Sequence, residues 1–401
     1  MKTFTNFKFQ MDTEIVFGRD TESKVGALVK KYGGSKVMAV YGGGSVKRSG
    51  LLDRVTSSLK EAGIDTVEFG GVRPNPRRSF VEDGILLAKN EKPDFYLGLG
   101  GGSAIDTAKA LALAAANDWT YWQFWNGIEP LAMAPVGSIH TLAAAGSETS
   151  RSSVLVDDME TGLKKGFDWD VCRPRFAIMN PELTYTLPDE QTAAGAVDVF
   201  AHTFMRYFAK GFSWLGDRYA AGTLKTVVKY AGKALENPKD YEARAELMLA
   251  GSFSHNDLTG IGKEASGKGG EHPLEHQLSG TYDTPHGAGL SVMMPALLEY
   301  ILHHGNPENI ARVAQFGVDV FNIDPEEAAP AETAKAAIAA LKTWLLSIDM
   351  PITLKGLGVP KDDIDAAISR CVTDTGGMIN GYMPLDSAAI DEIYRRAYDN
   401  I

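Results

Sequence analysis

The first half of the chain alternates short apolar runs with longer stretches of helical periodicity. Strands are predicted for the runs at 36–41, 66–69, 95–99, 132–135, 152–156 and 176–179. Helices are predicted at about 50–62, at 79–90, and from the glycines at 100–102 to residue 116. This alternation is typical of a parallel sheet that is covered by helices.

The pattern changes near Pro181, and from Leu187 onward it is almost wholly helical. Helices are predicted at 190–209, 214–235, 240–257, 288–303, 307–321 and 329–347. A chain of 401 residues is too long for one typical core. We therefore predict an α/β domain at residues 1–185 and an all-helical domain at 186–401.

Composition and charge exclude several classes of protein. Apolar and charged fractions of 44% and 23% are ordinary for a globular protein. The formal net charge of −11 comes without a basic stripe, which argues against a nucleic-acid partner. The longest apolar stretch, 111–116, is far too short for a membrane span, and residues 1–8 do not resemble a signal peptide. The two cysteines give no disulfide framework, so we expect a cytoplasmic protein without a membrane partner.

Residue types that bind metals gather in two segments of the helical half. Asp198 and His202 are four residues apart, so on a helix both side chains lie on one face. His272 and His276 repeat this spacing, and His286 follows a Thr-Pro turn. A lone Asp-x-x-x-His pair is more often a hydrogen bond on a helix surface. Together, however, three imidazoles and one carboxylate can hold a divalent transition metal, so we predict a metal site at these two segments.

Two glycine clusters each follow a predicted strand. In Gly100-Gly-Gly-Ser103, backbone amides and the start of a helix can receive a phosphate, although a tight turn without a ligand is the alternative. Asp106, in the same helix, either stabilises its first turn or faces a cofactor. The strict Gly-x-Gly-x-x-Gly pattern is absent, which counts against an ordinary Rossmann dehydrogenase.

The earlier cluster, Gly42-Gly-Gly-Ser45, is followed by Lys47 and Arg48. It contains no carboxylate that would bind a ribose 2′-hydroxyl and repel a 2′-phosphate. If a dinucleotide binds here, this balance of charge favours NADP over NAD. The competing interpretation is that both cations are ordinary solvated side chains.

These segments together resemble the iron-containing (group III) alcohol dehydrogenases, and most closely their NADPH-dependent butanol dehydrogenase and aldehyde reductase branch. The resemblance covers essentially the whole chain, through the motifs at 41–45, 73–76, 100–109, 180–188, 195–202 and 272–286. It implies a Rossmann-like dinucleotide-binding domain with a parallel sheet, an all-helical second domain, and an active site between them. This is the architecture shared with dehydroquinate synthase. The family also implies a homodimer, for which a first strand at about 13–17 is a candidate edge.

The resemblance also assigns roles to individual residues. Fe²⁺, or Zn²⁺ as in some relatives, would be held by Asp198, His202, His272 and His286. His276 would lie near the nicotinamide and the substrate and assist proton exchange. The remaining positions would bind NADP(H): the pyrophosphate at Gly100, Gly101, Gly102 and Ser103, the ribose phosphate at Gly43, Gly44 and Ser45, and further contacts at Asn75, Thr141, Lys165 (or Lys164) and Leu183.

Two segments depart from the pattern of the family. The segment Thr141-Leu-Ala-Ala-Ala-Gly-Ser-Glu148 lacks a proline and a threonine that relatives carry, so one hydroxyl contact near the nicotinamide is expected to be missing. Residues 260–270 are rich in glycine just before His272, which points to a looser segment or an altered substrate pocket.

The expected reaction is hydride transfer between NADP(H) and a small alcohol or aldehyde. A divalent cation would polarise the substrate oxygen, and activity should fall in acid because imidazoles must be neutral to bind a metal. A metal-dependent lyase of the dehydroquinate synthase type is the alternative, but 272–286 contains no Lys or Arg for a phosphorylated substrate. A metal-dependent hydrolase or a metal-storage protein would leave both glycine clusters without a role.

Overall fold

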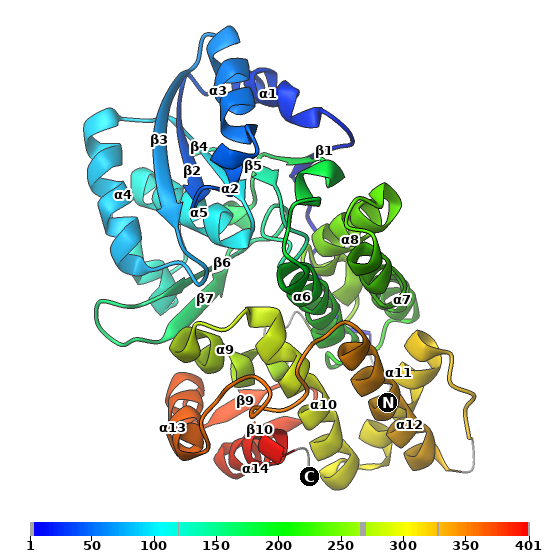
Figure 1. Ribbon diagram of the computed structural model, residues 1–401. Helices are drawn as coiled ribbons and strands as arrows, with labels where there is room; N and C mark the ends of the chain where they lie inside the picture. The colour runs from blue at the N-terminus through cyan, green and yellow to red at the C-terminus, as the bar shows by residue number, and fades with distance from the viewer. Residues whose placement is uncertain (1–3, 119, 265–269, 327–328, 400–401) are drawn as a thin grey trace. The chain divides into compact units, whose positions relative to one another are not determined.

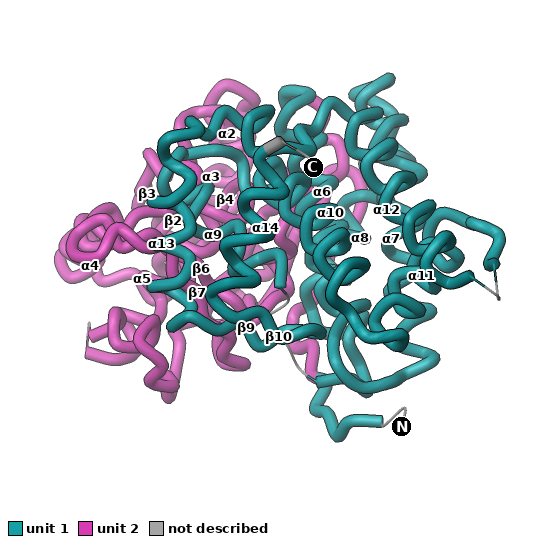
Figure 2. The backbone as a smooth tube through the Cα atoms, turned by 90° about the horizontal axis from the view of Figure 1, so that it is seen from below, with its two compact units in different colours: residues 1–9, 188–401 teal, residues 10–187 magenta. Residues whose placement is uncertain are grey.

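The protein is described from a computed structural model that covers residues 4–118, 120–264, 270–326 and 329–399 (Figure 1). The chain forms two compact units, one of residues 10–187 and one of residues 188–401 together with 1–9 (Figure 2). That residues 1–185 and 186–401 fold as two independent domains stays a prediction from the sequence.

The unit of residues 10–187 is built on a six-stranded sheet in which every neighbouring pair is parallel. The strand order is β1-β8-β5-β4-β2-β3, so the predicted first strand lies at an edge. The strands are β1 (Glu14–Phe17), β2 (Lys36–Gly42), β3 (Asp65–Val72), β4 (Phe95–Gly100), β5 (Val136–His140) and β8 (Phe176–Met179). The predicted α/β fold with a parallel sheet is therefore confirmed.

Helices cover both faces of this sheet (Figure 1). Along β2, the side chains of Val37, Ala39 and Tyr41 enter one core, and those of Met38 and Val40 enter the other. The first core also contains residues of α1 (Val25–Lys31) and α3 (Leu51–Glu61), and the second contains residues of α4 (Arg78–Glu91) and α5 (Gly102–Ala116). Burial on both faces explains why the central strands are continuous apolar runs in the sequence.

The order of the strands reverses between β2 and β4. From β2 the chain moves outward to β3, whereas from β4 it moves in the opposite direction to β5. In parallel α/β sheets, ligands bind beyond the carboxyl ends of the strands at such a reversal. Gly42 ends β2 and Gly100 ends β4, so both glycine clusters lie at this point.

One predicted strand is displaced. We expected a strand at 132–135, but β5 begins at Val136, directly after Pro135, which has no amide hydrogen to donate to a neighbouring strand. The sequence of β5, with Gly137, Ser138 and His140, lacks an apolar run. A Cβ on Gly137 would lie 2.3 Å from the ring of Phe176, so close packing of β8 requires glycine here. The predicted strand β6 (Ser152–Val156) is present, but it pairs with β7 (Lys164–Asp168) in a separate antiparallel sheet.

The second unit consists mostly of helices. They are α6 (Asp189–Tyr207), α7 (Trp214–Glu236), α8 (Tyr241–Ser254), α9 (Glu271–Tyr282), α10 (His286–His304), α11 (Pro307–Phe321), α12 (Pro330–Ser347), α13 (Ile364–Thr375) and α14 (Ser387–Asp399). The prediction of an all-helical domain is wrong in one detail, since β9 (Met378–Asn380) and β10 (Pro384–Asp386) form an antiparallel pair. Strands of three residues are too short to show an alternating pattern.

The glycine-rich stretch at 260–270, predicted to be looser or to alter a substrate pocket, is described only in part, because residues 265–269 lie outside the described residues.

Among the helices that the structure describes in both units, none is long and apolar enough to cross a lipid bilayer.

Two cations, the buried Lys263 and the partly buried Arg312, bind the carboxyl end of α6. Lys263 Nζ donates hydrogen bonds to the carbonyl oxygens of Arg206 (3.2 Å) and Tyr207 (3.0 Å), and Arg312 donates to the Tyr207 carbonyl. Both cations also pair with the buried Asp217. Cations at this end of a helix satisfy its last carbonyls and interact favourably with its dipole. The helix that carries Asp198 and His202 is thereby fixed.

Candidate active site

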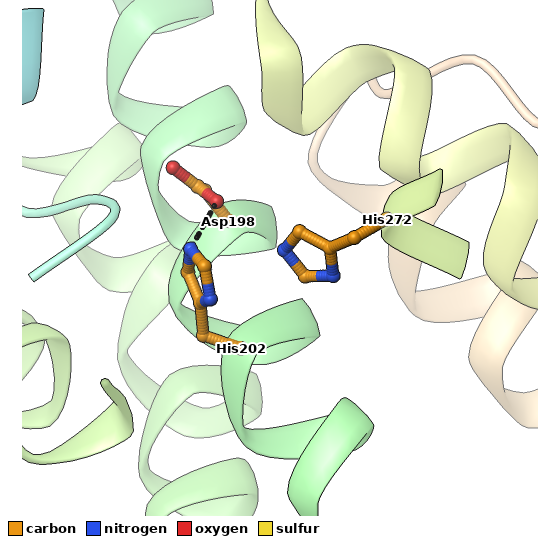
Figure 3. A group of neighbouring side chains, drawn as sticks. All are labelled: Asp198, His202 and His272. Carbon is orange, nitrogen blue, oxygen red and sulfur yellow. Dashed lines mark ion pairs between the residues drawn. The ribbon is translucent and has the colours of Figure 1, made fainter. Parts of the chain in front are cut away.

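Asp198 and His202 lie on the same buried face of α6, as their spacing predicts. Asp198 Oδ1 is 3.3 Å from His202 Nε2, and both side chains are more than nine-tenths buried. Figure 3 shows this pair with the imidazole of His272 directed toward it from another helix. The ligand atoms of these three residues all lie within 4.8 Å of one another.

His286 approaches the same carboxylate from the first residue of α10. Its Nε2 is 4.0 Å from Asp198 Oδ1, and its ring centroid is 5.4 Å from that of His272. The next residue, Gly287, is where α10 touches α6: a Cβ there would lie 1.9 Å from the carbonyl oxygen of Ala194. The missing side chain at Gly287 therefore allows His286 to approach Asp198.

Two buried carboxylates on α9 contact the other nitrogens of these imidazoles. Glu271 Oε1 is 3.0 Å from His272 Nδ1, and the Glu275 carboxylate contacts His286 Nδ1. A neutral imidazole that donates its Nδ1–H to a carboxylate keeps a lone pair on Nε2. These contacts favour the tautomers in which both histidines present Nε2 toward Asp198.

The donor set fits a divalent transition metal. Ligand atoms at about 2.0–2.2 Å from one tetrahedral ion lie roughly 3.4 Å apart, close to the separation of Asp198 and His202. Among the residues described, His272 Nε2 is buried without a hydrogen-bond partner, which is costly unless another group binds it. Burial is the main cause that holds the pKa of His202 well below its usual range, and repulsion from His255 and His272 adds to it. His202 is therefore neutral and able to act as a ligand at neutral pH.

Two more histidines lie beside the cluster. The ring of His276 is 5.7 Å from that of His286 and 6.3 Å from that of His272, and it is partly exposed. His255, at the end of α8, stacks on His202 with ring centroids 3.9 Å apart and planes 20° apart. The sequence pattern points to His276 but not to His255, which has no second metal-binding residue at helical spacing.

Most residues predicted to bind the cofactor follow the carboxyl ends of the parallel strands. Gly43, Gly44 and Ser45 follow β2, and Gly101, Gly102 and Ser103 follow Gly100 at the end of β4. Asn75 comes after β3, Thr141 after β5 and Leu183 after β8. Because these strands are parallel, their carboxyl ends meet at one edge of the sheet. The fold thus brings these predicted positions to a single edge.

Asp106 and Lys165 have other contacts. Asp106 is buried and accepts hydrogen bonds from Ser147 Oγ and, at 3.0 Å, from the backbone amide of Val154. It holds the segment that follows β5, rather than capping α5. Lys165 belongs to β7 and donates to Asn126 Oδ1 at 3.1 Å, whereas Lys164 is buried.

One charged residue beside the first glycine cluster was missed. Glu68 of β3 accepts a hydrogen bond from the hydroxyl of Tyr41 at 2.7 Å and lies 3.3 Å from Lys47 Nζ. The first glycine cluster contains no carboxylate in its own sequence, but the neighbouring strand supplies one. Only the pairing of β2 with β3 could reveal it.

Comparisons with known proteins agree with this geometry. The sequence model for iron-containing alcohol dehydrogenases matches residues 12–181, and the model for the C-terminal part of the same family matches residues 192–398. NADH-dependent butanol dehydrogenase A of Clostridium acetobutylicum is 37% identical over 396 residues, which cover 98% of this chain and 100% of that protein. NADPH-dependent aldehyde reductase YqhD of Escherichia coli is 33% identical over 371 residues, with coverage of 91% and 92%.

Solved structures give the same answer. The crystal structure of NADH-dependent butanol dehydrogenase A from Thermotoga maritima superposes with a TM-score of 0.93 at 34% identity, over the full length of both chains. The crystal structure of YqhD superposes with a TM-score of 0.89 at 31% identity. Both halves of the sequence and the whole fold lead to one assignment. The chain belongs to the iron-containing alcohol dehydrogenase family.

Proposed function

We propose that this protein is a metal-dependent oxidoreductase that transfers a hydride between NADP(H) and a small alcohol or aldehyde. The observation that carries the proposal is the buried group of Asp198, His202 and His272, with ligand atoms within 4.8 Å of one another. Burying imidazoles and a carboxylate together is costly, and binding a divalent cation would offset that cost.

Asp198, His202, His272 and His286 would hold the metal. When bound, the metal supplies Lewis-acid chemistry at a substrate oxygen, which favours hydride transfer to a carbonyl carbon or from an alcohol carbon. Imidazole and carboxylate ligands suit both Fe²⁺ and Zn²⁺, and we propose Fe²⁺ because the chain belongs to the iron-containing family. Glu271 and Glu275 would keep His272 and His286 in the tautomers that binding requires.

His276 is proposed to exchange the proton that the reaction adds to or removes from the substrate oxygen. It is one helical turn from His272, and its ring lies 5.7 Å from that of His286. Unlike the buried His272, it is partly exposed, so solvent can return its proton. An imidazole has one nitrogen that can accept a proton and one that can donate it, as a general acid or base must.

The cofactor is proposed to lie along the carboxyl edge of the sheet. The amino end of α5, with Gly101 and Gly102 before it, offers backbone amides and a favourable dipole to the pyrophosphate. At the other cluster, Arg48 Nη1 would be 3.2 Å from a Cβ placed on Gly44, and Arg48 has no ion pair among the residues described. A free guanidinium beside this turn supports binding of a 2′-phosphate and therefore NADP(H).

Membership of the alcohol dehydrogenase family supports hydride transfer over the lyase alternative. The relatives differ in their cofactor: one is named as NADH-dependent and another as NADPH-dependent, at 37% and 33% identity. The proposed preference for NADP(H) therefore rests on this chain's own residues. The homodimer and the location in the cytoplasm stay predictions from the sequence.

The test is aldehyde-dependent loss of NADPH absorbance by the purified protein supplied with Fe²⁺ or Zn²⁺, across a panel of short-chain aldehydes and with NADH in parallel. We expect turnover with both cofactors and a higher kcat/KM with NADPH. Arg48→Met should raise the KM for NADPH more than the KM for NADH. Absence of turnover with every aldehyde and both cofactors would refute the proposal, and a large preference for NADH would refute its cofactor.

A further inference from the structure

A carboxylate from β3 engages one of the two cations at the first glycine cluster. Glu68 is 3.3 Å from the ammonium of Lys47, which belongs to the short helix α2 (Ser45–Arg48). The hydroxyl of Tyr41, on β2, donates to the same carboxylate oxygen at 2.7 Å. Lys47 Nζ also lies 5.2 Å from the centroid of the Tyr41 ring. Glu68, Tyr41 and Lys47 thus form one group, here called the Glu68 triad.

The triad lies on the adenosine side of the proposed cofactor site. Tyr41 directly precedes Gly42 at the carboxyl end of β2, and Lys47 follows Ser45 by two residues. The pyrophosphate is proposed to bind after β4, on one side of β2, whereas β3 lies on the other side. A dinucleotide that extends from β4 across β2 reaches the β3 side with its adenosine ribose.

The two cations of this cluster are therefore not equivalent. Lys47 is paired with Glu68, while Arg48 lies over Gly44 without an ion pair in the described structure. The hydrogen bond from Tyr41 lowers the pKa of Glu68, so its carboxylate is ionised at neutral pH. A ribose 2′-phosphate would meet one available guanidinium and a Lys47–Glu68 pair whose charges cancel.

We propose that Glu68 determines cofactor specificity by holding Lys47 away from a 2′-phosphate and repelling that phosphate, so that it limits the preference for NADPH over NADH. The inference rests on the proposed function, because it assumes that a nicotinamide dinucleotide binds at this edge. In this proposal Glu68 discriminates between NADPH and NADH, and the glycines after β4 position the pyrophosphate of either cofactor.

The expected effect is moderate because the two charged members of the triad are open to solvent. The side chains of Lys47 and Glu68 are 56% and 47% exposed. Solvent screens such a pair, so breaking it releases Lys47 at little cost to folding. We expect Glu68→Gln to lower the Kd for NADPH by about two- to fivefold, since exposed charge pairs have this order of effect. The Kd for NADH, which has no 2′-phosphate, should change less than twofold.

The experiment measures the dissociation constants of NADPH and NADH for the full-length protein by isothermal titration, with kcat/KM for each cofactor as a second readout. Lys47→Met is combined with Glu68→Gln in a double-mutant cycle. We expect Lys47→Met to have a small effect in the parent protein and to remove most of the gain in the Glu68→Gln background. Raising the ionic strength should reduce the difference between the two backgrounds.

Glu91→Gln is the matched control. Glu91 is 43% exposed and pairs with Lys36 at 2.8 Å, at the amino end of β2, so this variant removes the same charge at the opposite edge of the sheet. It should leave the ratio of the two dissociation constants unchanged. An unchanged ratio in Glu68→Gln, or a gain that survives Lys47→Met, would overturn the inference. If the parent protein binds neither cofactor, the proposed function itself fails.

Discussion

The histidine cluster and the glycine edge differ in what they are made of. The cluster consists mostly of buried side chains, and two of its histidines, His272 and His286, contact buried carboxylates through their second nitrogens, so its members depend on one another. The edge consists largely of backbone at the ends of strands, and its charged groups, Lys47 and Glu68, are half exposed. Buried polar groups are costly to leave unpaired, whereas exposed charges are screened. A change of one charge should therefore have a large effect in the cluster and a small effect at the edge.

The largest effect is expected from Asp198→Asn. The amide of Asn has nearly the same shape as the carboxylate of Asp, but it has no negative charge and is a much weaker ligand for a metal ion. We expect the metal content of the purified protein to fall from near one per chain to a small fraction, and kcat to fall by about 10³-fold. The metal is measured by elemental analysis. Asp189→Asn, an exposed residue on the same helix, is the control and should retain both metal and activity.

A smaller effect is expected from Glu275→Gln. It keeps the side chain beside His286 Nδ1 but removes the charge that favours the Nδ1–H tautomer. The loss of metal affinity should be about 10- to 100-fold, as for other residues that orient metal ligands. Affinity is measured by competition with a chelator. Glu299 lies on the same helix as His286, and its partly buried carboxylate pairs with Lys342. Glu299→Gln removes this carboxylate and should leave the affinity for the metal unchanged.

The effect of pH on the metal-free protein tests the burial of the cluster. Because burial lowers the pKa of His202, the unfolded state binds an extra proton below the usual histidine pKa of about 6.5. The free energy of unfolding should therefore be highest above that pH and decrease as the pH falls toward the lowered pKa. Because His202 binds only one proton, its contribution to the slope of the unfolding free energy against pH is at most about 1.4 kcal/mol per pH unit.

Urea denaturation at several pH values measures this dependence. His202→Gln should reduce the slope, whereas replacement of the exposed His303 by Gln should not. A parent protein whose stability does not change between pH 7 and pH 5 would contradict the assignment of His202 as a buried neutral ligand.

The smallest effect is expected from Gly43→Ala. A Cβ at Gly43 would meet no atom of the protein within 4 Å, and its backbone is not in the left-handed region. Folding stability should change by less than about 0.5 kcal/mol. The Kd for the cofactor should nevertheless rise by roughly fivefold, because the methyl group would weaken one close backbone contact with the ligand. Gly222→Ala, equally open and exposed on α7, should leave the Kd unchanged.

The sequence predicted the parts of the molecule that repeat a local pattern. The i,i+4 spacing placed Asp198 and His202 on one face of α6, and the apolar runs located β2, β4 and β8. It could not locate β5, whose close packing on Phe176 requires small residues in place of an apolar run. The ligand set and the cofactor contacts stay predictions.

Other residues had no local pattern that could identify them. His255 is a lone histidine, and Glu271 and Glu275 look like ordinary helix carboxylates until α9 is seen packed beside α10. Glu68 belongs to an edge strand, where an alternating polar residue usually faces solvent. His255, Glu275 and Glu68 acquire their contacts from a second element, and Glu271 contacts the adjacent His272 only because α9 directs both side chains to the same place, so only the tertiary structure identifies them.

Gly287 has a consequence for how this protein tolerates mutation. It has no side chain with which to bind a metal, substrate or cofactor, yet any Cβ there would overlap the carbonyl of Ala194 on α6. A substitution would separate the two helices that bring His286 and Asp198 together. In a saturation screen, Gly287 should tolerate as few residues as the histidines themselves. Intolerance to mutation at Gly287 would reflect the spacing of two helices. A ranking of residues by mutational sensitivity alone would mistake Gly287 for a metal-binding residue.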